Sequence, residues 1–461
     1  MKDIERDAYK DLVYWKEHDN RVLLVEGARQ VGKTYLVKKF VKESFPSTIY
    51  IDMSDDSGER FLSILEKYIG LGDEEKLLLT TLKEYNKDFN NVKDTIVVID
   101  EIQESHLVYN KIRSFNRLMN CRFIVTGSYL GRTTLSNKFW ESAGDFSSIT
   151  IVPLTFREFL GAVNESLTKI FDNIDLYGGS PKEQYKSLKE FYIVYTIIGG
   201  YPALVNEFLE SKKLENVYKL DEKLLEIFST ESARYLKAEE YIILIRRSFN
   251  YFARLLLKEK KGLHNNNPSE ELIKLNTNLT YKEGSLNFNK VQYTKVLSWL
   301  ITNKSLYSCD KVINCDLLNV ENDQRFYFND LGILNYLLVS MEIEEGISKG
   351  ILNENYVCIV LKNKNLMTNF GTFANYEIDF LIKDSEYIYG IEVKSGKDSG
   401  KSVKMAYKKG MINKILYLKG DTFGGIEGDI ITIPIYLFER FKFKPSREKN
   451  LQNLEIFQSF K

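Results

Sequence analysis

Short apolar runs in the first third of the chain predict a sheet of buried strands. Residues 21–26, 96–99 and 122–128 contain runs of Val, Ile, Leu and Phe, a pattern typical of parallel strands covered on both faces. A helical segment, residues 35–40, follows the first run, and residues 149–155 have the pattern of a last strand. We therefore expect an α/β domain built on a parallel sheet.

The rest of the chain alternates between helical and strand-like patterns. Apolar residues recur at helical spacing in residues 188–198, and glycine and proline at residues 199–202 break that helix before another begins. Residues 293–301 predict an amphipathic helix, and a strand-like stretch follows at residues 305–308. Helices followed by such a hairpin suggest a winged-helix type of domain. From residue 331 onward, helices come first and strands afterwards.

The glycine-rich stretch after the first strand has the chemistry of a nucleoside triphosphate site. It reads Gly-Ala-Arg-Gln-Val-Gly-Lys-Thr and lies between a strand and a helix, which is the context that this loop requires. Its backbone N–H groups and the positive end of the helix would surround the α- and β-phosphates. Lys33 would reach the β- and γ-phosphates, and the Thr34 hydroxyl would bind Mg²⁺. The nucleotide-binding residues predicted in this loop are Gly27, Gln30, Val31, Gly32, Lys33 and Thr34.

The apolar run at residues 96–99 supplies the second half of this site. It ends in Asp100 and Glu101, two carboxylates at the carboxyl end of a strand, where ligands of open α/β sheets bind. Asp100 would hold Mg²⁺ through its water shell, and Glu101 would orient and deprotonate the water that attacks the γ-phosphate. Further along, Thr126 or Ser128 would contact the γ-phosphate or that water, the alternative being a plain turn after a strand.

Composition adds few constraints. The 461 residues are 44% hydrophobic and 28% charged, as in ordinary globular proteins, and their length suggests about three domains. Lys+Arg and Asp+Glu balance at 64 each, so a nucleic-acid surface would have to be local. No apolar run is long enough to span a bilayer, and the first residues lack the apolar core of a secretion signal. The spacing of the four cysteines and the three histidines disfavours zinc and disulfides, so we expect a cytoplasmic protein without a membrane partner.

The last third of the chain carries a second chemical pattern. Residues 375–382 predict a strand that contains Glu377 and Asp379, and the following strand contains Glu392 and Lys394. In a strand, residues two apart share a face, so the members of each pair would point the same way. Paired across a hairpin, Asp379 and Glu392 would share a divalent cation, Mg²⁺ or Mn²⁺. Lys394 would lie beside the cation to orient water or steady a phosphate.

Two neighbouring features would extend this cluster. A helix that begins near residue 350 would bring Glu354 into it. Lys401, Lys404 and Lys408 follow at helical spacing and would form a phosphate track close behind the metal site. The alternatives are charged residues alternating on an exposed strand and a solvated lysine face, because both are common on protein surfaces. An aspartate followed by Glu-x-Lys resembles the pattern of restriction-endonuclease-like nucleases.

Taken in order, the motifs resemble a family of prokaryotic ATP-binding proteins. Its members have an N-terminal AAA-type ATPase domain and a C-terminal domain of formerly unknown function that is related to restriction-endonuclease folds. The matching stretches run in family order over nearly the whole chain and are residues 26–34, 98–103, 126–128, 153–159, 199–202, 326–332, 354–355, 377–379 and 391–396. The resemblance implies a P-loop ATPase, a winged-helix-like middle and a nuclease-like end.

The patterns and the resemblance together predict five segments, one of which is a helical region similar to the lid of many P-loop ATPases. The segments are a P-loop AAA-type ATPase domain at 1–160, a helical lid at 161–240, a winged-helix-like domain at 241–330, a restriction-endonuclease-like α/β domain at 331–445 and a C-terminal tail at 446–461.

One position departs from the family pattern. Relatives carry a Gly-Arg between the Thr-Gly-Ser strand and the Pro-Leu-Thr-Phe segment, whereas this chain has Gly144 followed by Asp145. An arginine that stabilises transition-state charge raises the rate by orders of magnitude, so without it we expect either slow hydrolysis or substitution by Arg132 or Arg157. Arg157 is equally compatible with a structural ion pair. AAA-type sites commonly sit at subunit boundaries and no arginine of this chain obviously completes the site, so we expect ATP-favoured homo-oligomers.

Two classes of function are compatible with these patterns. The first is an ATPase coupled to nucleic-acid binding and to metal-dependent cleavage, with DNA rather than RNA as the expected substrate. Its catalytic residues would be Glu101, Asp379, Glu392 and Lys394, and its metal ligands would be Thr34, Asp100, Glu354, Asp379 and Glu392. The second class is an ATPase switch whose C-terminal domain is a non-catalytic platform for nucleic acid or protein. Neutral net charge favours the second class, and the joint presence of the C-terminal carboxylates and lysine favours the first.

Overall fold

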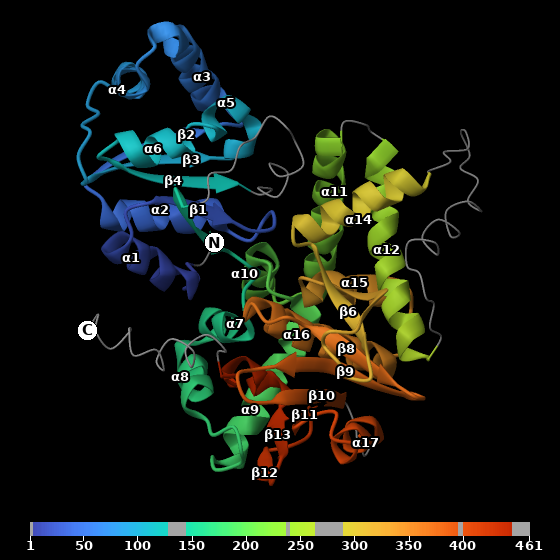
Figure 1. The fold of residues 1–461 in the computed structure, drawn as a ribbon. Coiled ribbons are helices and arrows are strands. Elements are labelled where there is room, and N and C mark those ends of the chain that lie inside the picture. Colours follow the sequence, from blue (N-terminus) through green and yellow to red (C-terminus); the bar gives the residue numbers. More distant parts are fainter. Residues whose placement is uncertain (1–2, 128–143, 237–239, 263–288, 395–399, 445–461) are drawn as a thin grey trace, which may run out of the picture. The chain divides into compact units, whose positions relative to one another are not determined.

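The computed structural model divides into two compact units (Figure 1). The structure describes residues 3–127, 144–236, 240–262, 289–394 and 400–444. The first unit comprises residues 3–153 together with 302–304, and the second comprises residues 154–301 and 305–461. Within the described ranges, no helix is both long and apolar enough to cross a membrane.

A five-stranded parallel sheet forms the centre of the first unit, as the sequence predicts. Its elements are α1 (Ala8–His18), β1 (Val22–Glu26), α2 (Lys33–Ser44), β2 (Ser47–Asp52), α3 (Asp56–Tyr68), α4 (Glu74–Tyr85), β3 (Thr95–Asp100), α5 (His106–Tyr109), α6 (Ile112–Leu118), β4 (Arg122–Gly127) and β5 (Phe146–Thr150). The strand order is β2-β3-β4-β1-β5, and every neighbouring pair is parallel. Figure 1 shows α1 and α2 on one side of this sheet and α3, α4 and α6 on the other.

The strands form because their apolar residues are covered on both faces. Every residue of β3 is buried, and Ile99 packs in one core with Phe61 of α3 and Phe115 of α6. The last strand, β5, lies earlier than the expected residues 149–155. It ends at Thr150 because the chain then approaches Pro153, which has no N–H to donate to a sheet.

The second unit combines helices with an eight-stranded mixed sheet. Its helices are α7 (Phe156–Val163), α8 (Glu165–Asn173), α9 (Lys182–Ile198), α10 (Pro202–Ser211), α11 (Leu214–Leu236), α12 (Glu240–Lys260), α14 (Lys290–Thr302), α15 (Leu331–Ser340), α16 (Glu345–Asn363) and α17 (Lys401–Lys408). Its strands are β6 (Leu306–Ile313), β7 (Val320–Phe328), β8 (Asn369–Phe373), β9 (Tyr376–Lys383), β10 (Ile388–Lys394), β11 (Lys414–Lys419), β12 (Gly425–Glu427) and β13 (Ile430–Pro434). The strand order is β12-β13-β11-β10-β9-β8-β6-β7.

The predicted middle segment shares this sheet with the predicted end segment. The β6–β7 hairpin is hydrogen-bonded into the sheet because β6 pairs in parallel with β8. The boundary expected at residue 330 therefore falls within one sheet-based unit. The boundary expected at residue 160 falls inside α7, whose Phe156 ring packs against the Tyr192 and Tyr195 rings of α9.

A bulge in β9 decides which of its side chains share a face. Asn369 of β8 pairs with Leu381, but Gly371 pairs with Ile378, so β9 has one extra residue between these two pairs. As a result, Ile378 and Leu381 both pack in a core with Val403 of α17, although they are three residues apart. The intervening part of β9 is turned toward the other face of the sheet.

Three of the stretches that carry the family resemblance meet at a structural junction in the second unit. The Gly200 N–H donates to Asp330 Oδ2 at 2.6 Å, and the Leu154 N–H donates to the Gly200 carbonyl at 2.6 Å. A Cβ on Gly332 would lie 2.2 Å from the Ile198 carbonyl oxygen, so only glycine fits there. These residues therefore hold helices and sheet together at the start of α15.

Candidate functional site

The glycine-rich loop between β1 and α2 has the backbone geometry of a phosphate cradle. Gly27, Gln30 and Gly32 have φ angles of 151°, 63° and 90°, in the region that favours glycine. A Cβ on Gly27 would lie 2.1 Å from the backbone carbonyl oxygen that follows β5. The Val31 carbonyl accepts a hydrogen bond from Arg6 Nη1 at 2.8 Å. Arg6, which no motif marks, therefore anchors the loop.

Lys33 folds back onto this loop. Its Nζ donates to the carbonyl oxygens of Gly27 at 3.0 Å and Ala28 at 2.9 Å, and only 5% of the residue is exposed. An ammonium group has three donors and no acceptor, so phosphate oxygens placed in the loop would compete directly for it. The side chain predicted to meet the β- and γ-phosphates thus lies in the cradle.

Asp100 is the polar centre at the carboxyl end of β3. Its carboxylate accepts hydrogen bonds from Thr34 Oγ1 at 2.9 Å and from the Glu101 N–H at 3.1 Å. The Thr126 and Tyr50 hydroxyls also donate to it. Burial and then Asp100 raise the pKa of Tyr50, so this tyrosine stays a donor. The adjacent oxygens of Thr34 and Asp100 are the hard ligands that Mg²⁺ prefers.

Glu101 directly follows β3 and has a left-handed backbone conformation, with φ of 50°, which non-glycine residues rarely adopt. Its Oε2 accepts a hydrogen bond from Gln103 Nε2 and lies 4.0 Å from Arg29 Nη2 in the glycine-rich loop. These two contacts, which no motif indicates, hold the carboxylate beside the loop, where a general base is needed. The predicted contact of Ser128 lies outside the described residues.

The position where relatives carry an arginine has a structural role in this chain. Asp145 is buried and accepts a hydrogen bond from Arg117 Nε at 2.8 Å. Arg157, one candidate substitute, forms an ion pair with Asp172 at 2.6 Å. This is the structural ion pair that was the alternative to a catalytic role. The other candidate, Arg132, lies outside the described residues.

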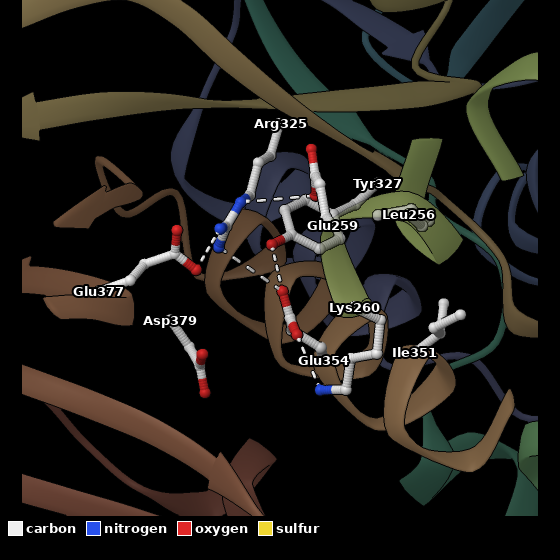
Figure 2. A pocket seen from close by; sticks show the side chains of 9 residues that line it. All are labelled: Leu256, Glu259, Lys260, Arg325, Tyr327, Ile351, Glu354, Glu377 and Asp379. Carbon is white, nitrogen blue, oxygen red and sulfur yellow. Dashed lines mark hydrogen bonds and ion pairs between the residues drawn. The ribbon is translucent and has the colours of Figure 1, made fainter. Parts of the chain in front are cut away.

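In the second unit, charged side chains surround a cavity of about 190 Å³ (Figure 2). We call it the carboxylate cavity, and its lining residues are Leu256, Glu259, Lys260, Arg325, Tyr327, Ile351, Glu354, Glu377 and Asp379. Figure 2 shows the carboxylates of Glu354 and Glu377 directed toward Arg325, with the Asp379 carboxylate turned away from the guanidinium. The structure therefore brings together Glu354 and Asp379, as expected, with cations that no motif indicated.

Arg325 extends from β7 into the cavity and is only 4% exposed. Its guanidinium forms ion pairs with Glu259 at 3.4 Å, with Glu354 at 3.8 Å and with Glu377. The guanidinium carbon lies 4.1 Å from the centre of the Phe370 ring, within cation–π range. Because an arginine cannot lose its proton in a protein, this buried positive charge is permanent.

Glu354 lies in the middle of α16, which begins earlier than expected, at Glu345. The helix continues through its glycines because an isolated glycine costs a helix only about 1 kcal/mol. Glu354 Oε1 accepts a hydrogen bond from the Tyr327 hydroxyl at 2.8 Å, and Oε2 lies 3.4 Å from Lys260 Nζ. Burial opposes ionisation, but the charges of Lys260 and Arg325 outweigh it and lower the pKa of Glu354. Glu354 is therefore an ionised carboxylate that already has cationic partners.

Asp379 lies where β9 and β10 stop pairing. The last residue pair is Ile391 with Phe380, and beyond it Asp379 Oδ2 accepts a hydrogen bond from the Val393 N–H at 2.7 Å. Beyond the last backbone pair, the Asp379 side chain thus accepts the hydrogen bond that β10 would otherwise make to the backbone of β9. This bond and the bulge in β9 fix the Asp379 carboxylate at the fork between the two strands.

Glu392 and Lys394 contact each other on β10, as residues on one face of a strand should. Lys394 Nζ lies 2.7 Å from Glu392 Oε1, and Glu392 is buried. Burial and then the charges of Glu354 and Glu392 raise the pKa of Asp379, so a cation would stabilise these carboxylates. In the part of the chain that the structure describes, however, no three acidic, imidazole or thiol groups converge to hold a metal ion. The expected three-carboxylate site is not assembled because Glu354 is engaged by other partners.

The lysine face of α17 belongs to the side of the sheet that carries Glu392 and Lys394, not to the side of the carboxylate cavity. Lys401, Lys404 and Lys408 are exposed, but α17 packs through Val403 against the face of the sheet that is opposite the carboxylate cavity. The bulge in β9 leaves Leu381 on the α17 face and turns Asp379 to the face of the carboxylate cavity. Lys401 Nζ lies 5.8 Å from the centre of the Tyr376 ring, beside the β8–β9 turn.

Comparison with known families identifies the first unit. Residues 19–160 match the family model described as an AAA domain, and this range contains the parallel sheet, the glycine-rich loop and both strand-end carboxylates. This part of the chain is therefore an AAA-type P-loop ATPase domain, and the protein is an ATPase. No curated protein matches the sequence significantly.

Solved structures match this chain with low scores. A Walker-type ATPase of Pyrococcus abyssi is 18% identical, with 73% of this chain and 96% of that chain covered and a TM-score of 0.42. The ORC1 protein of Aeropyrum pernix, solved in complex with DNA, is 13% identical, with 74% and 94% covered and a TM-score of 0.28. The RuvB Holliday junction branch migration motor of Thermotoga maritima is 13% identical, with 66% and 89% covered and a TM-score of 0.30.

Proposed function

We propose that this ATPase couples Mg²⁺-dependent ATP hydrolysis to the binding of nucleic acid, and that its second unit cleaves the bound strand with a divalent metal. We take DNA as the substrate and a homo-oligomer as the working form. In this proposal, residues 161–240 act as a helical lid, residues 241–330 as a winged-helix-like segment and residues 331–445 as the restriction-endonuclease-like part. The observation that carries the cleavage step is the placement of Asp379 at the fork of β9 and β10, beside Glu354 and the Glu392–Lys394 pair.

In the ATP site, each proposed role follows from the position of a side chain. Lys33 would exchange its two loop carbonyls for β- and γ-phosphate oxygens. Thr34 and Asp100 would hold Mg²⁺, which neutralises charge on the phosphates. Glu101 would accept a proton from the attacking water, and Thr126 would keep the Asp100 carboxylate oriented. The products would be ADP and inorganic phosphate.

In the second unit, the carboxylates at the fork would hold the metal. Asp379 and Glu392 would be its ligands, and Glu354 would join them from α16. A bound metal ion polarises the scissile phosphate and lowers the pKa of its water. Lys394, now paired with Glu392, would turn to the phosphate as negative charge develops there. The raised pKa of Asp379 supports this assignment, because a cation relieves the same repulsion that a proton relieves.

A specific observation favours a second candidate function, in which the second unit binds nucleic acid or protein without cleaving it. Arg325 and Lys260 already neutralise Glu354, and the described residues contain no group of three metal ligands. In that case the buried Arg325 guanidinium would permanently neutralise the carboxylate charge that a metal ion would otherwise neutralise. Metal-dependent cleavage discriminates between the two candidates.

The test is a cleavage assay with the full chain. Labelled single-stranded, duplex and branched DNA and RNA are incubated with Mg²⁺ or Mn²⁺, with and without ATP. We expect cleavage by the wild type, loss of cleavage in Asp379→Ala, and nearly unchanged ATP hydrolysis in that variant because the ATP site lies in the other unit. Glu427→Ala, which removes an exposed carboxylate of β12, is the matched control and should cleave normally. A wild type that binds nucleic acid but cleaves no substrate would establish the non-catalytic alternative.

A further inference from the structure

Two cations line the carboxylate cavity, and the structure holds them very differently. Arg325 extends from β7 over the Phe370 ring, and its side chain is only 5% exposed. Lys260 is the last residue of α12, and its side chain is 34% exposed. Its Nζ lies 3.4 Å from Glu354 Oε2, beyond the usual range of an N–H···O hydrogen bond. Lys260 is therefore the cation that can leave the cavity wall, whereas Arg325 is fixed in it.

The two cations contact different oxygens of Glu354 (Figure 2). Oε1 accepts a hydrogen bond from the Tyr327 hydroxyl at 2.8 Å and lies 3.8 Å from Arg325 Nη1. Oε2 is the oxygen that lies beside the Lys260 ammonium. A carboxylate can bind a metal ion through a single oxygen. Glu354 could therefore keep Arg325 and Tyr327 on Oε1 while a metal ion takes the place of Lys260 on Oε2.

The charge of Lys260 also reaches Asp379, which lines the same cavity. Burial and the neighbouring carboxylates raise the pKa of Asp379, and the charge of Lys260 opposes that rise. The same ammonium thus compensates Glu354 and Asp379, two of the three carboxylates proposed to hold a divalent metal. A metal ion at this site would supply that compensation instead. Lys260 therefore takes the electrostatic place of the proposed metal.

The helix that carries Glu354 leaves space for this lysine. Gly350 lies one turn before Glu354 on α16, and a Cβ on Gly350 would lie 2.8 Å from Lys260 Cε. Glycine at this position thus allows the end of the lysine side chain to lie close against α16. A methyl group there would push that end aside, because the end of a lysine side chain is flexible.

The cavity also has room for an exchange between the ammonium and a metal ion. Its volume is about 190 Å³, whereas a water molecule takes roughly 30 Å³ in the liquid, so a cation could enter with part of its water shell. A lysine ammonium is a compact and strongly hydrated charge on a flexible stem. Because the Lys260 side chain is partly exposed, its ammonium can exchange Glu354 for water without becoming a buried, unpaired charge.

We propose that Lys260 competes with a divalent metal ion for Glu354 and Asp379, and that it keeps the proposed metal site closed until its ammonium turns away. The inference rests on the proposed nuclease function and states how the site of that function is regulated. It also explains why the described residues contain no group of three metal ligands, since the lysine holds Glu354 instead. The second unit would then cleave only at metal concentrations high enough to displace the ammonium.

Titration of the full chain with Mn²⁺ in the absence of ATP, followed by the electron paramagnetic resonance signal of free Mn²⁺, tests this directly. Lys260→Met removes the competing charge and keeps most of the apolar stem. It should bind Mn²⁺ roughly ten- to a hundred-fold more tightly than the wild type, because the metal no longer competes with a charged hydrogen bond. Gly350→Ala keeps every charge but displaces the end of the lysine, so it should tighten binding in the same direction.

Lys219→Met is the matched control, because Lys219 forms an exposed pair with Glu215 on α11 and does not line the carboxylate cavity. It should bind Mn²⁺ like the wild type, and thermal melting checks that all variants fold. Adding Asp379→Ala to Lys260→Met should abolish the gain, because the metal loses a ligand. Unchanged Mn²⁺ affinity in both Lys260→Met and Gly350→Ala would overturn the proposal. A gain that persists with Asp379→Ala would also overturn it, since the metal would then bind elsewhere.

Cleavage is scored separately, as the Mn²⁺ concentration that gives half-maximal cleavage by the wild type and by Lys260→Met. That concentration should be lower for Lys260→Met. Cleavage by the wild type without a gain in Mn²⁺ affinity in either variant rejects the role of Lys260 and leaves the proposed nuclease intact. A gain in affinity without cleavage by any of the proteins keeps the role of Lys260 and rejects the nuclease. The two failures are therefore distinguishable.

Discussion

Replacing Arg325 by methionine tests whether the carboxylate cavity depends on its buried cation. The methionine side chain keeps much of the apolar contact with Phe370 but removes the charge that compensates Glu259, Glu354 and Glu377. Breaking a buried ion pair by removing one partner typically costs about 3–5 kcal/mol. The second unit should therefore lose stability. The size of the loss depends on how strongly each of the three remaining carboxylates is charged and buried.

The three carboxylates contribute unequally to this loss. Burial raises the pKa of Glu259 to about 8, so at pH 8 it is only partly ionised and loses less than a fully ionised carboxylate would. The Glu377 side chain is 31% exposed, so solvent screens part of its charge. Glu354 is only 13% exposed but keeps Lys260 and Tyr327 as partners. We therefore expect a loss of about 3 kcal/mol at pH 8, at the lower end of the range for buried pairs.

The loss of stability should be larger at high pH than at low pH. Without Arg325, the pKa of Glu354 rises in the folded state, because one of the charges that lower it is gone, so the folded variant holds a proton that the unfolded chain has released. Stability then falls as pH rises, and the deficit relative to wild type should shrink to about 1 kcal/mol near pH 5. Arg325→Met combined with Glu377→Gln should recover part of the stability at pH 8, because one uncompensated charge is gone.

Urea denaturation followed by circular dichroism at pH 5 and pH 8 measures these effects. Hydrogen exchange of peptides from β7 to β9 assigns the transition to the second unit, since a chain with two units need not unfold in one step. Arg246→Met is the matched control, because Arg246 forms a largely exposed pair with Glu222, and its loss should cost below about 1 kcal/mol at either pH. An Arg325→Met variant that is as stable as wild type at pH 8, or equally deficient at both pH values, would refute the reasoning.

Further predictions concern the ATP site, the assembly and a buried acid. Lys33→Ala should weaken ATP binding roughly ten- to a hundred-fold in calorimetry, as expected for lost hydrogen bonds to a charged ligand. Glu101→Gln should bind ATP normally and lose hydrolysis about a hundred-fold or more, because only the base is removed; equal loss of binding in both variants would contradict these roles. Light scattering at micromolar concentration should show oligomers with ATP and Mg²⁺, and a monomer there would indicate a self-contained site. Burial raises the pKa of Asp221 to about 9, and neither of its oxygens has a hydrogen-bond partner among the described residues. The folded protein thus keeps a proton that the unfolded chain releases above about pH 4, so stability should fall between about pH 4 and 9, and Asp221→Asn should flatten that slope in urea midpoints.

The ATP site could be predicted from the sequence because its chemistry is local. The geometry of the glycine-rich loop depends on residues within one short stretch, and the structure places Lys33 and Thr34 at its end. Asp100 and Glu101 follow a strand whose apolar pattern marks it as buried, so their position at the sheet edge also follows from sequence. What the sequence did not reveal are the partners of these residues, such as Tyr50 and Gln103, which act by side-chain contacts that no spacing rule encodes.

The second unit shows where sequence reasoning stops. Alternation along the strands placed Glu392 beside Lys394 correctly, because that relation involves only neighbours on one strand. The bulge in β9 could not be predicted, since it depends on how β9 pairs with β8, and it separates the lysine face of α17 from the carboxylate cavity. Likewise, no motif marks Arg325.

One physical reason explains why the ATP site could be predicted from the sequence and the surroundings of the C-terminal carboxylates could not. A phosphate loop and a strand face are set by backbone geometry within a few residues, so their chemistry is written in consecutive positions. The charge that a buried carboxylate experiences is set by every group around it, whatever its place in the chain. Glu354 meets Lys260 from α12 and Arg325 from β7 only after the helices and the sheet have packed together. The sequence by itself therefore determined the ATP site and the strands that carry the C-terminal acids, whereas tertiary packing alone decided which cations those acids meet.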